Sequence, residues 1–377
     1  MTVSDPFSCF GDSSESDEDN NNSIKDSDSN SNLSNLIEGK RLKDKCNTDT
    51  ATDPATASLI PISIIPIESD SFVVYETEDA GMSIRAAKAY KCGELIMQES
   101  AAMRIPNSQS ASSSEAAEVM HQEACQRAFN SMHPSTKSAF LELSSCREND
   151  EDKTPHGIYD TNSYRLGDGC TNNLGGLFLT LSRMNHSCMP NVNHYWREEL
   201  QMTLIFACRD IAAGEEMCTI YGPSHFMDTN SRRQYLHERF AFICHCQMCT
   251  EGNIKGGDDR MAKMNSLLED IALSSSSSSS FTSNDCNDSG VKTSTTLALI
   301  QNCLGLMKDS GLGAGVFTKS ILHQGYIYSL SAGDRQGARS YLVDELKAVQ
   351  DSEGRGCPRS IEIQETLCRL DSMIHSY

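Results

Sequence analysis

The sequence lacks several features that would assign it to a common class of protein. It has no run of about 18 apolar residues, so it predicts no membrane-spanning helix. Its first residues, 1–6, hold neither a basic segment nor an apolar core, so we expect no secretory signal. Basic residues are scarce: 32 stand against 52 acidic ones, a formal net charge of −20. This deficit opposes binding to a phosphate backbone, so we expect no direct contact with nucleic acid.

The acidic charge is spread along the whole chain. Residues 1–55 hold 12 acidic and 5 basic residues, so the remainder of the chain is acidic as well. Such a charge can attract a basic protein substrate, for example a lysine-rich tail. Solubility alone explains the same charge, and composition does not separate the two explanations.

Cysteine is abundant, with 16 residues, but it does not indicate a disulfide scaffold. Three cysteines fall within six positions, 244–249, in a large chain with no predicted signal. That pattern favours reduced thiols and one metal site, hence an intracellular protein of the nucleus or cytoplasm.

Composition and periodicity divide the chain into segments. Residues 1–68 are predicted to be a disordered acidic tail, because residues 1–55 are rich in Ser, Asp, Asn and Glu and have few aromatics. Short strand patterns between turns predict a β-rich domain over 69–250, interrupted by a helical insertion at 101–155. A linker with a serine tract follows at 251–295, and four amphipathic patterns predict a helical C-terminal region at 296–377. The predicted fold class is β-rich α+β.

The cysteine cluster predicts a zinc site. Cys244, Cys246 and Cys249 place three thiols on one short segment, and thiolates suit zinc in a tetrahedron of four ligands. A fourth ligand is missing locally, and Cys188 is a candidate on a distant segment. Three unrelated buried cysteines remain the alternative, and spacing alone does not settle the fourth ligand.

The segment 182–191 is the densest in side chains that bind or react. It contains Asn185 and His186, which we interpret as facing a cofactor, although a histidine is as often structural. Pro190 and its polar neighbours favour an irregular, ligand-facing loop. Tyr221 follows a predicted strand, where it is either a packing residue or a group that orients a nucleophile.

Six motifs in a fixed order resemble those of SET-domain protein lysine methyltransferases, nearest to the SMYD-like group but without its MYND finger. They are Ala80–Ala86, Lys91–Ile96, Asn162–Tyr164, Asn185–Asn191, Gly214–Met217 with Tyr221, and Phe242 with the cysteines that follow it. The resemblance covers about residues 71–250 and identifies 235–250 as a post-SET zinc segment.

The resemblance implies a function and a role for each candidate residue. The protein would transfer a methyl group from S-adenosylmethionine to a lysine of a protein, possibly a histone. Tyr221 would be the catalytic residue. The cofactor would contact Gly81, Met82, Ser83, Ile84, Asn162, Asn185, His186 and Phe242, and zinc would be bound by Cys188, Cys244, Cys246 and Cys249.

Two departures from the family pattern bear on this function. Ser83 replaces a glycine of the opening turn, which costs energy if the backbone there needs a positive φ. Phe240 stands where many relatives have a tyrosine in the lysine channel, which bears on the number of methyl groups added. The alternative function is therefore a catalytically inactive SET-derived interaction module. Oligomeric state is not predicted.

Overall fold

The computed structural model describes residues 70–375, apart from 79, 107–114, 147–152, 168–173, 223–225, 255 and 277–285. The tail predicted at 1–68 lies outside the described residues, as does part of the serine tract. Within the described part of the chain, no helix is both long enough and apolar enough to cross a membrane.

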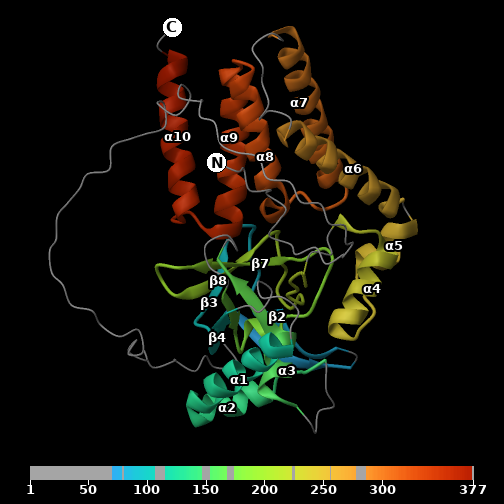
Figure 1. The fold of residues 1–377 in the computed structure, drawn as a ribbon, viewed down its shortest axis with the longest axis vertical. Helices are drawn as coiled ribbons and strands as arrows, with labels where there is room; N and C mark the ends of the chain where they lie inside the picture. Colours follow the sequence, from blue (N-terminus) through green and yellow to red (C-terminus); the bar gives the residue numbers. More distant parts are fainter. Residues whose placement is uncertain are drawn as a thin grey trace, which may run out of the picture. The chain divides into compact units, whose positions relative to one another are not determined.

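The described strands form three small antiparallel sheets (Figure 1). The strands are β1 (Phe72–Thr77), β2 (Gly81–Ala86), β3 (Leu95–Glu99), β4 (Met103–Pro106), β5 (Ser163–Leu166), β6 (Leu174–Leu177), β7 (Val192–Arg197) and β8 (Met202–Ala207). The first sheet pairs β1 with β2, the second has the order β3-β8-β7, and the third has the order β4-β6-β5. The predicted β-rich class is confirmed.

The helices interrupt and follow these sheets. They are α1 (Glu115–Ser131), α2 (Pro134–Leu141), α3 (Pro155–Asn162), α4 (Thr229–Phe240), α5 (Gln247–Ile254), α6 (Gly257–Ser276), α7 (Cys286–Asp309), α8 (Gly315–Ser331), α9 (Arg335–Glu353) and α10 (Pro358–His375). The predicted helical C-terminal region is confirmed, and α8 and α9 lie side by side in it (Figure 1).

The predicted linker at 251–295 is wrong in one respect. α7 begins at Cys286, inside that range, and α6 occupies 257–276. α6 and α7 pack on each other, and such tertiary contact outweighs the low helix propensity of the Asn, Asp, Ser and Gly residues at the start of α7.

The segment 101–155 is not helical throughout. β4 lies within it, because Met103 and Ile105 are buried and their backbones pair with β6. At its other end, α3 continues past the predicted boundary to Asn162. The Thr154 side chain caps α3 by accepting from Gly157 N, and a proline at the first turn favours the same start.

The expected last strand, 217–220, is also absent from the described strands. Thr219 forms only an isolated bridge with His186. The partner segment around His186 is irregular, so no continuous ladder can form beside it.

The helical C-terminal region is attached to the β3-β8-β7 sheet. Asn193 on β7 donates to the Ser352 carbonyl at 2.9 Å, and Arg197 donates to the Gly356 carbonyl at 3.0 Å. β8 is almost entirely buried because α9 packs against this sheet. The sheet whose strand β7 directly follows the signature segment, residues 182–191, therefore has a helical support.

Candidate functional site

The signature segment is held at both ends by buried polar side chains. Before it, the Glu99 carboxylate accepts from the backbone of Thr180 at 2.8 Å and of Leu181 at 3.0 Å. Burial raises the pKa of Glu99, and these hydrogen bonds oppose that rise. After it, Asn191 accepts from Cys218 N at 2.8 Å and donates to the Glu216 carbonyl at 2.7 Å. Side chains therefore fix both ends of the loop, and between them it forms an isolated bridge with Thr219 rather than a continuous sheet ladder.

Asn185 contacts a carboxylate in the structure. Its side-chain nitrogen donates to Glu216 Oε1 at 3.1 Å. Ser83 on β2 donates to the same oxygen through its hydroxyl, and the Ser83 side chain is fully buried. Sequence reasoning did not single out Glu216, although it lies in the Gly214–Met217 motif.

The backbone of β2 explains how the serine is tolerated. Gly81 has a φ of 67°, a conformation that favours glycine. Ser83 is not among the described residues with positive φ; it lies in extended β2 backbone. The Ile84 carbonyl accepts from Met217 N at 2.8 Å, while the Met82 side chain is exposed. The positive φ is needed at Gly81, so Ser83 brings no backbone strain.

His186 has a defined tautomer. Its Nδ1 accepts from the backbone N–H of Tyr221 at 2.9 Å, so the proton of a neutral ring lies on Nε2. That atom is 3.3 Å from the Cys188 sulfur, to which it donates. Burial lowers the pKa of His186 to about 4, which keeps the ring neutral. The imidazole therefore links the signature segment to the cysteine cluster.

Tyr221 lies in an aromatic group beside His186. Its ring centroid is 5.3 Å from His186, 4.9 Å from Phe240 and 6.2 Å from Phe242. Its hydroxyl donates to the Met184 carbonyl at 2.7 Å. Burial raises the pKa of Tyr221 well above its usual range, so the hydroxyl keeps its proton at neutral pH. Tyr221 is suited to orienting a group, and unsuited to removing a proton from one.

Asn162, the last residue of α3, connects two parts of the structure. Its side-chain nitrogen donates to the carbonyls of Ser144 and Ile158, each at 2.7 Å. Its own carbonyl accepts from the Ser182 hydroxyl at 3.0 Å. Asn162 thus joins the helical insertion to the start of the signature segment, and its contact with a cofactor stays a prediction.

The four cysteines come together from two distant segments. The sulfur atoms of Cys188, Cys244, Cys246 and Cys249 all lie within 4.8 Å of one another. Cys188 Sγ is 3.9 Å from Cys244 Sγ and 3.6 Å from Cys249 Sγ. Thiolates about 2.3 Å from a tetrahedral zinc are separated by about 3.8 Å. The cluster is therefore compatible with zinc.

Hydrogen bonds couple the protonation of the four thiols. Those with Cys188 foremost lower the pKa of Cys246 and of Cys249, whereas the bond with Cys244 foremost raises the pKa of Cys188. The Arg232 guanidinium, itself buried, donates to Cys249 Sγ at 3.5 Å. Arg232 is a second residue that sequence reasoning missed, since nothing in its spacing within α4 connects it to the cysteines.

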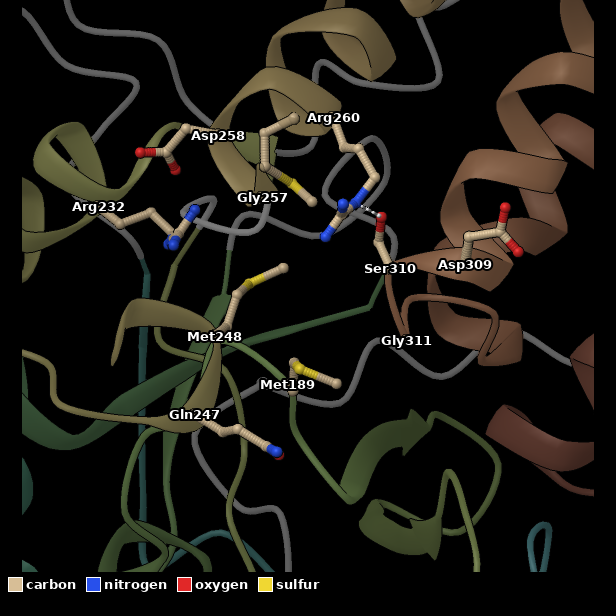
Figure 2. A pocket seen from close by; sticks show the side chains of 11 residues that line it. Met189, Arg232, Gln247, Met248, Gly257, Asp258, Arg260, Asp309, Ser310 and Gly311 are labelled. Carbon is tan, nitrogen blue, oxygen red and sulfur yellow. Dashed lines mark hydrogen bonds between the residues drawn. The ribbon is translucent and has the colours of Figure 1, made fainter. Parts of the chain in front are cut away.

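A pocket of about 280 Å³ lies next to this cluster (Figure 2). Met189, which follows Cys188, and Met248, between two of the cysteines, contribute to its lining together with Arg232. Arg260 donates to the Ser310 hydroxyl at 3.3 Å on another side of it. None of the residues predicted to contact a cofactor lines this pocket. It is therefore separate from the group formed by Asn185, His186 and Tyr221.

These features belong to a known class of protein. Residues 81–222 match the SET domain family, whose limits enclose Gly81, the signature segment and Tyr221. The chain therefore contains a SET domain over these residues.

Two relatives make the resemblance more particular. The chain is similar to Histone-lysine N-methyltransferase set5 of Schizosaccharomyces pombe, 33% identical over 189 residues, or 49% of this chain and 52% of that protein. It is also similar to Protein-lysine N-trimethyltransferase SMYD5 of Danio rerio, 41% identical over 76 residues, or 20% of this chain and 18% of that protein. The chain spans about half the length of the first relative. The SMYD-like resemblance is confirmed.

One solved structure, the SET domain of LSMT bound to lysine and AdoHcy, covers 80% of this chain and 86% of its own, at 10% identity and a TM-score of 0.32. A likeness this low carries no argument about function.

Proposed function

We propose that this protein transfers a methyl group from S-adenosylmethionine to the side chain of a lysine in a protein, with histones as the first substrates to test. The similarity to histone-lysine and protein-lysine methyltransferases supports the reaction class. The observation that carries the proposal is the group formed by His186, Tyr221 and Phe242, since it brings together three of the six motifs that resemble the family.

S-adenosylmethionine, when bound, supplies an electrophilic methyl group on a sulfonium. The protein must align a neutral amine with that group, because an in-line displacement depends on orientation. The hydroxyl proton of Tyr221 is directed at the Met184 carbonyl, so the Tyr221 oxygen can accept a hydrogen bond from the amine. The buried aromatic surroundings also favour the neutral form of the amine by desolvation.

The proposed cofactor contacts include Ser83 and Asn185, which both donate to the Glu216 carboxylate. The full set is Gly81, Met82, Ser83, Ile84, Asn162, Asn185, His186 and Phe242. Because Ser83 and Asn185 share Glu216 as acceptor, β2 and the signature segment are held in register before any cofactor arrives. Preorganisation of this kind lowers the cost of binding.

We propose that Cys188, Cys244, Cys246 and Cys249 bind one structural zinc. Four protein ligands would fill its coordination, so it would take no part in the chemistry.

The net charge of −20 supports a basic protein as partner, and a histone substrate would require access to the nucleus.

Labelled methyl transfer from S-adenosylmethionine to purified histones, and separately to a cell lysate, tests the proposal. We expect label in protein that is acid-stable and located on lysine by mass spectrometry. Calorimetry with S-adenosylmethionine should show binding by the full chain. Absence of both binding and transfer would contradict the enzyme and favour an inactive module.

A further inference from the structure

A second cluster of metal-binding side chains lies in the helical insertion, outside the motifs discussed above. α1 contributes Glu118 and His121, three residues apart, and α3 contributes His156 and Asp160, four residues apart. Side chains at these spacings share one face of a helix. α1 and α3 pack against each other, so the two faces meet (Figure 1).

The distances among these atoms are those of a small coordination shell. His121 Nε2 is 3.0 Å from Asp160 Oδ1, and His156 Nε2 is 3.3 Å from Asp160 Oδ2. His156 Nε2 is also 3.3 Å from Glu118 Oε1. Nitrogen and oxygen ligands about 2.0–2.1 Å from a tetrahedral zinc are separated by about 3.3–3.4 Å. Two of the observed separations, both 3.3 Å, equal the edge of such a tetrahedron, and His121, His156 and Asp160 each have a ligand atom within 4.8 Å of the others.

The cluster is buried, and one of its nitrogens lacks a suitable partner. The side chains of His121, His156 and Asp160 are 7%, 12% and 15% exposed, while Glu118 closes the rim at 49%. His156 Nε2 is closed off from solvent and, despite two carboxylate oxygens at 3.3 Å, makes no hydrogen bond of acceptable direction. A buried nitrogen in that state is costly unless something binds it.

We propose that His121, His156 and Asp160 bind a zinc ion that fastens α1 to α3, and that the half-exposed Glu118 carboxylate beside His156 supplies the fourth ligand when the metal is bound. Two imidazoles and two carboxylates are a ligand set that zinc accepts, and the two carboxylates balance its charge. With Glu118 turned onto the ion, all four positions are filled by protein, so the ion is structural. It also fixes the end of α3, two residues before Asn162, whose side chain and carbonyl join the insertion to the signature segment.

The competing explanation is a metal-free network in which the two histidines donate to Asp160. Both explanations use the same residues, so metal stoichiometry must separate them. The full chain is equilibrated with a small excess of zinc, freed of unbound metal by gel filtration, and measured for zinc per chain by mass spectrometry. We expect His121→Ala and Asp160→Asn each to hold one zinc fewer than the unaltered chain.

His237→Ala is the matched control, because His237 is an exposed histidine on α4 and belongs to neither cluster. It should keep the full complement of zinc. Asp160→Asn is nearly isosteric, and circular dichroism reports whether each variant folds. An unaltered chain whose zinc content equals that of folded Asp160→Asn would overturn the proposal, as would loss of zinc from His237→Ala alone.

Cobalt distinguishes this site from the cysteine cluster. Cobalt bound by thiolates shows intense sulfur-to-metal charge-transfer absorption, which imidazole and carboxylate ligands do not produce. We expect His121→Ala to keep that charge-transfer band while it loses one equivalent of cobalt. Loss of the band in His121→Ala would assign the missing metal to the cysteines and overturn the proposal.

Discussion

Ser83 and Asn185 donate hydrogen bonds to the same oxygen, Oε1 of Glu216. One carboxylate thereby joins β2 to the signature segment. The relationship also accounts for the serine at a position where glycine was expected, since Ser83 lies in extended backbone and its buried hydroxyl has a partner. Ser83 was the one feature of the sequence that favoured an inactive module, and in the structure it no longer does.

Glu216→Ala should destabilise the protein, because it leaves the donors of Ser83 and Asn185 without their acceptor. A buried donor without a partner costs about 1–3 kcal/mol. We expect the free energy of unfolding in urea to fall by about that amount, and the affinity for S-adenosylmethionine in calorimetry to fall with it. Glu216→Gln keeps an acceptor oxygen and should lose less. Equal stability of Glu216→Ala and the unaltered protein would show that the shared acceptor does not matter.

Tyr221→Phe should lower methyl transfer while leaving cofactor binding nearly unchanged. The substitution removes the proposed acceptor for the substrate amine and the hydrogen bond to Met184. Loss of one well-placed polar group in an active site typically costs about 100-fold or more in rate. Initial rates of labelled transfer measure the effect, and calorimetry measures the binding.

Tyr326→Phe is the matched control for that substitution, because Tyr326 is partly buried against the core of the C-terminal helices. Its rate should stay within about twofold of the unaltered protein, since a hydroxyl remote from the reaction makes no contact with the transition state. Equal rates for Tyr221→Phe and Tyr326→Phe would remove Tyr221 from the mechanism.

Local residue patterns in the sequence predicted most of the strands and helices. The elements that depend on contacts between distant segments were missed or given wrong bounds. The periodic spacing of apolar residues, together with the turn residues between the elements, predicted the β7–β8 hairpin and the helices α8, α9 and α10. β4 was missed because four residues carry too little pattern, and Met103 is fixed as strand only by pairing with Leu177. α7 was predicted too short, since packing on α6 is not visible in its polar first turns.

The candidate site shows the same division. Cys188 was placed with the other cysteines by its resemblance to a family motif, and no spacing could have joined it to Cys244 across 56 positions. Glu216 and Arg232 were missed because their partners come from other segments. The pairing of His121 with Asp160 likewise depends on how α1 packs against α3. Chemistry that requires two distant segments is therefore the part that the structure adds.

Acid should destabilise the protein partly through His194 on β7. Burial, with a smaller contribution from Lys319, lowers the pKa of His194 to about 4. An unfolded histidine titrates near 6.5, so as pH falls below that value the unfolded state takes up a proton that folded His194 does not. The stability that the neutral ring confers is present above pH 6.5 and lost as pH falls towards 4.

The measurement is the free energy of unfolding between pH 7 and pH 4.5, for the unaltered protein and His194→Gln. A single such group contributes a slope of at most about 1.4 kcal/mol per pH unit. Glutamine does not titrate, so the variant should show the shallower slope, whatever its stability at pH 7. Parallel curves for the two proteins would show that His194 is protonated in the folded state.

Cys246→Ser should release the zinc of the cysteine cluster and destabilise the hydrophobic core that surrounds it. Cys188, Cys244 and Cys249 are all buried there, beside Leu236 of α4 and Met264 of α6. Because binding to a structural site is coupled to folding, we expect the loss of one zinc per chain to lower the unfolding temperature markedly.

Cys368→Ser is the control, since Cys368 is an exposed thiol on α10 and lies outside the cluster. It should change neither the zinc content nor the unfolding temperature. A chelator added to the unaltered protein should reproduce the effect of Cys246→Ser, and in cobalt-substituted protein the thiolate charge-transfer band should disappear with Cys246→Ser alone. An undiminished band in Cys246→Ser would show that Cys246 is not a ligand.

The His186 contact with Cys188 Sγ makes the test informative about the cofactor site as well. Once zinc no longer orders Cys188, the His186 ring loses a fixed partner and binding of S-adenosylmethionine should weaken in parallel.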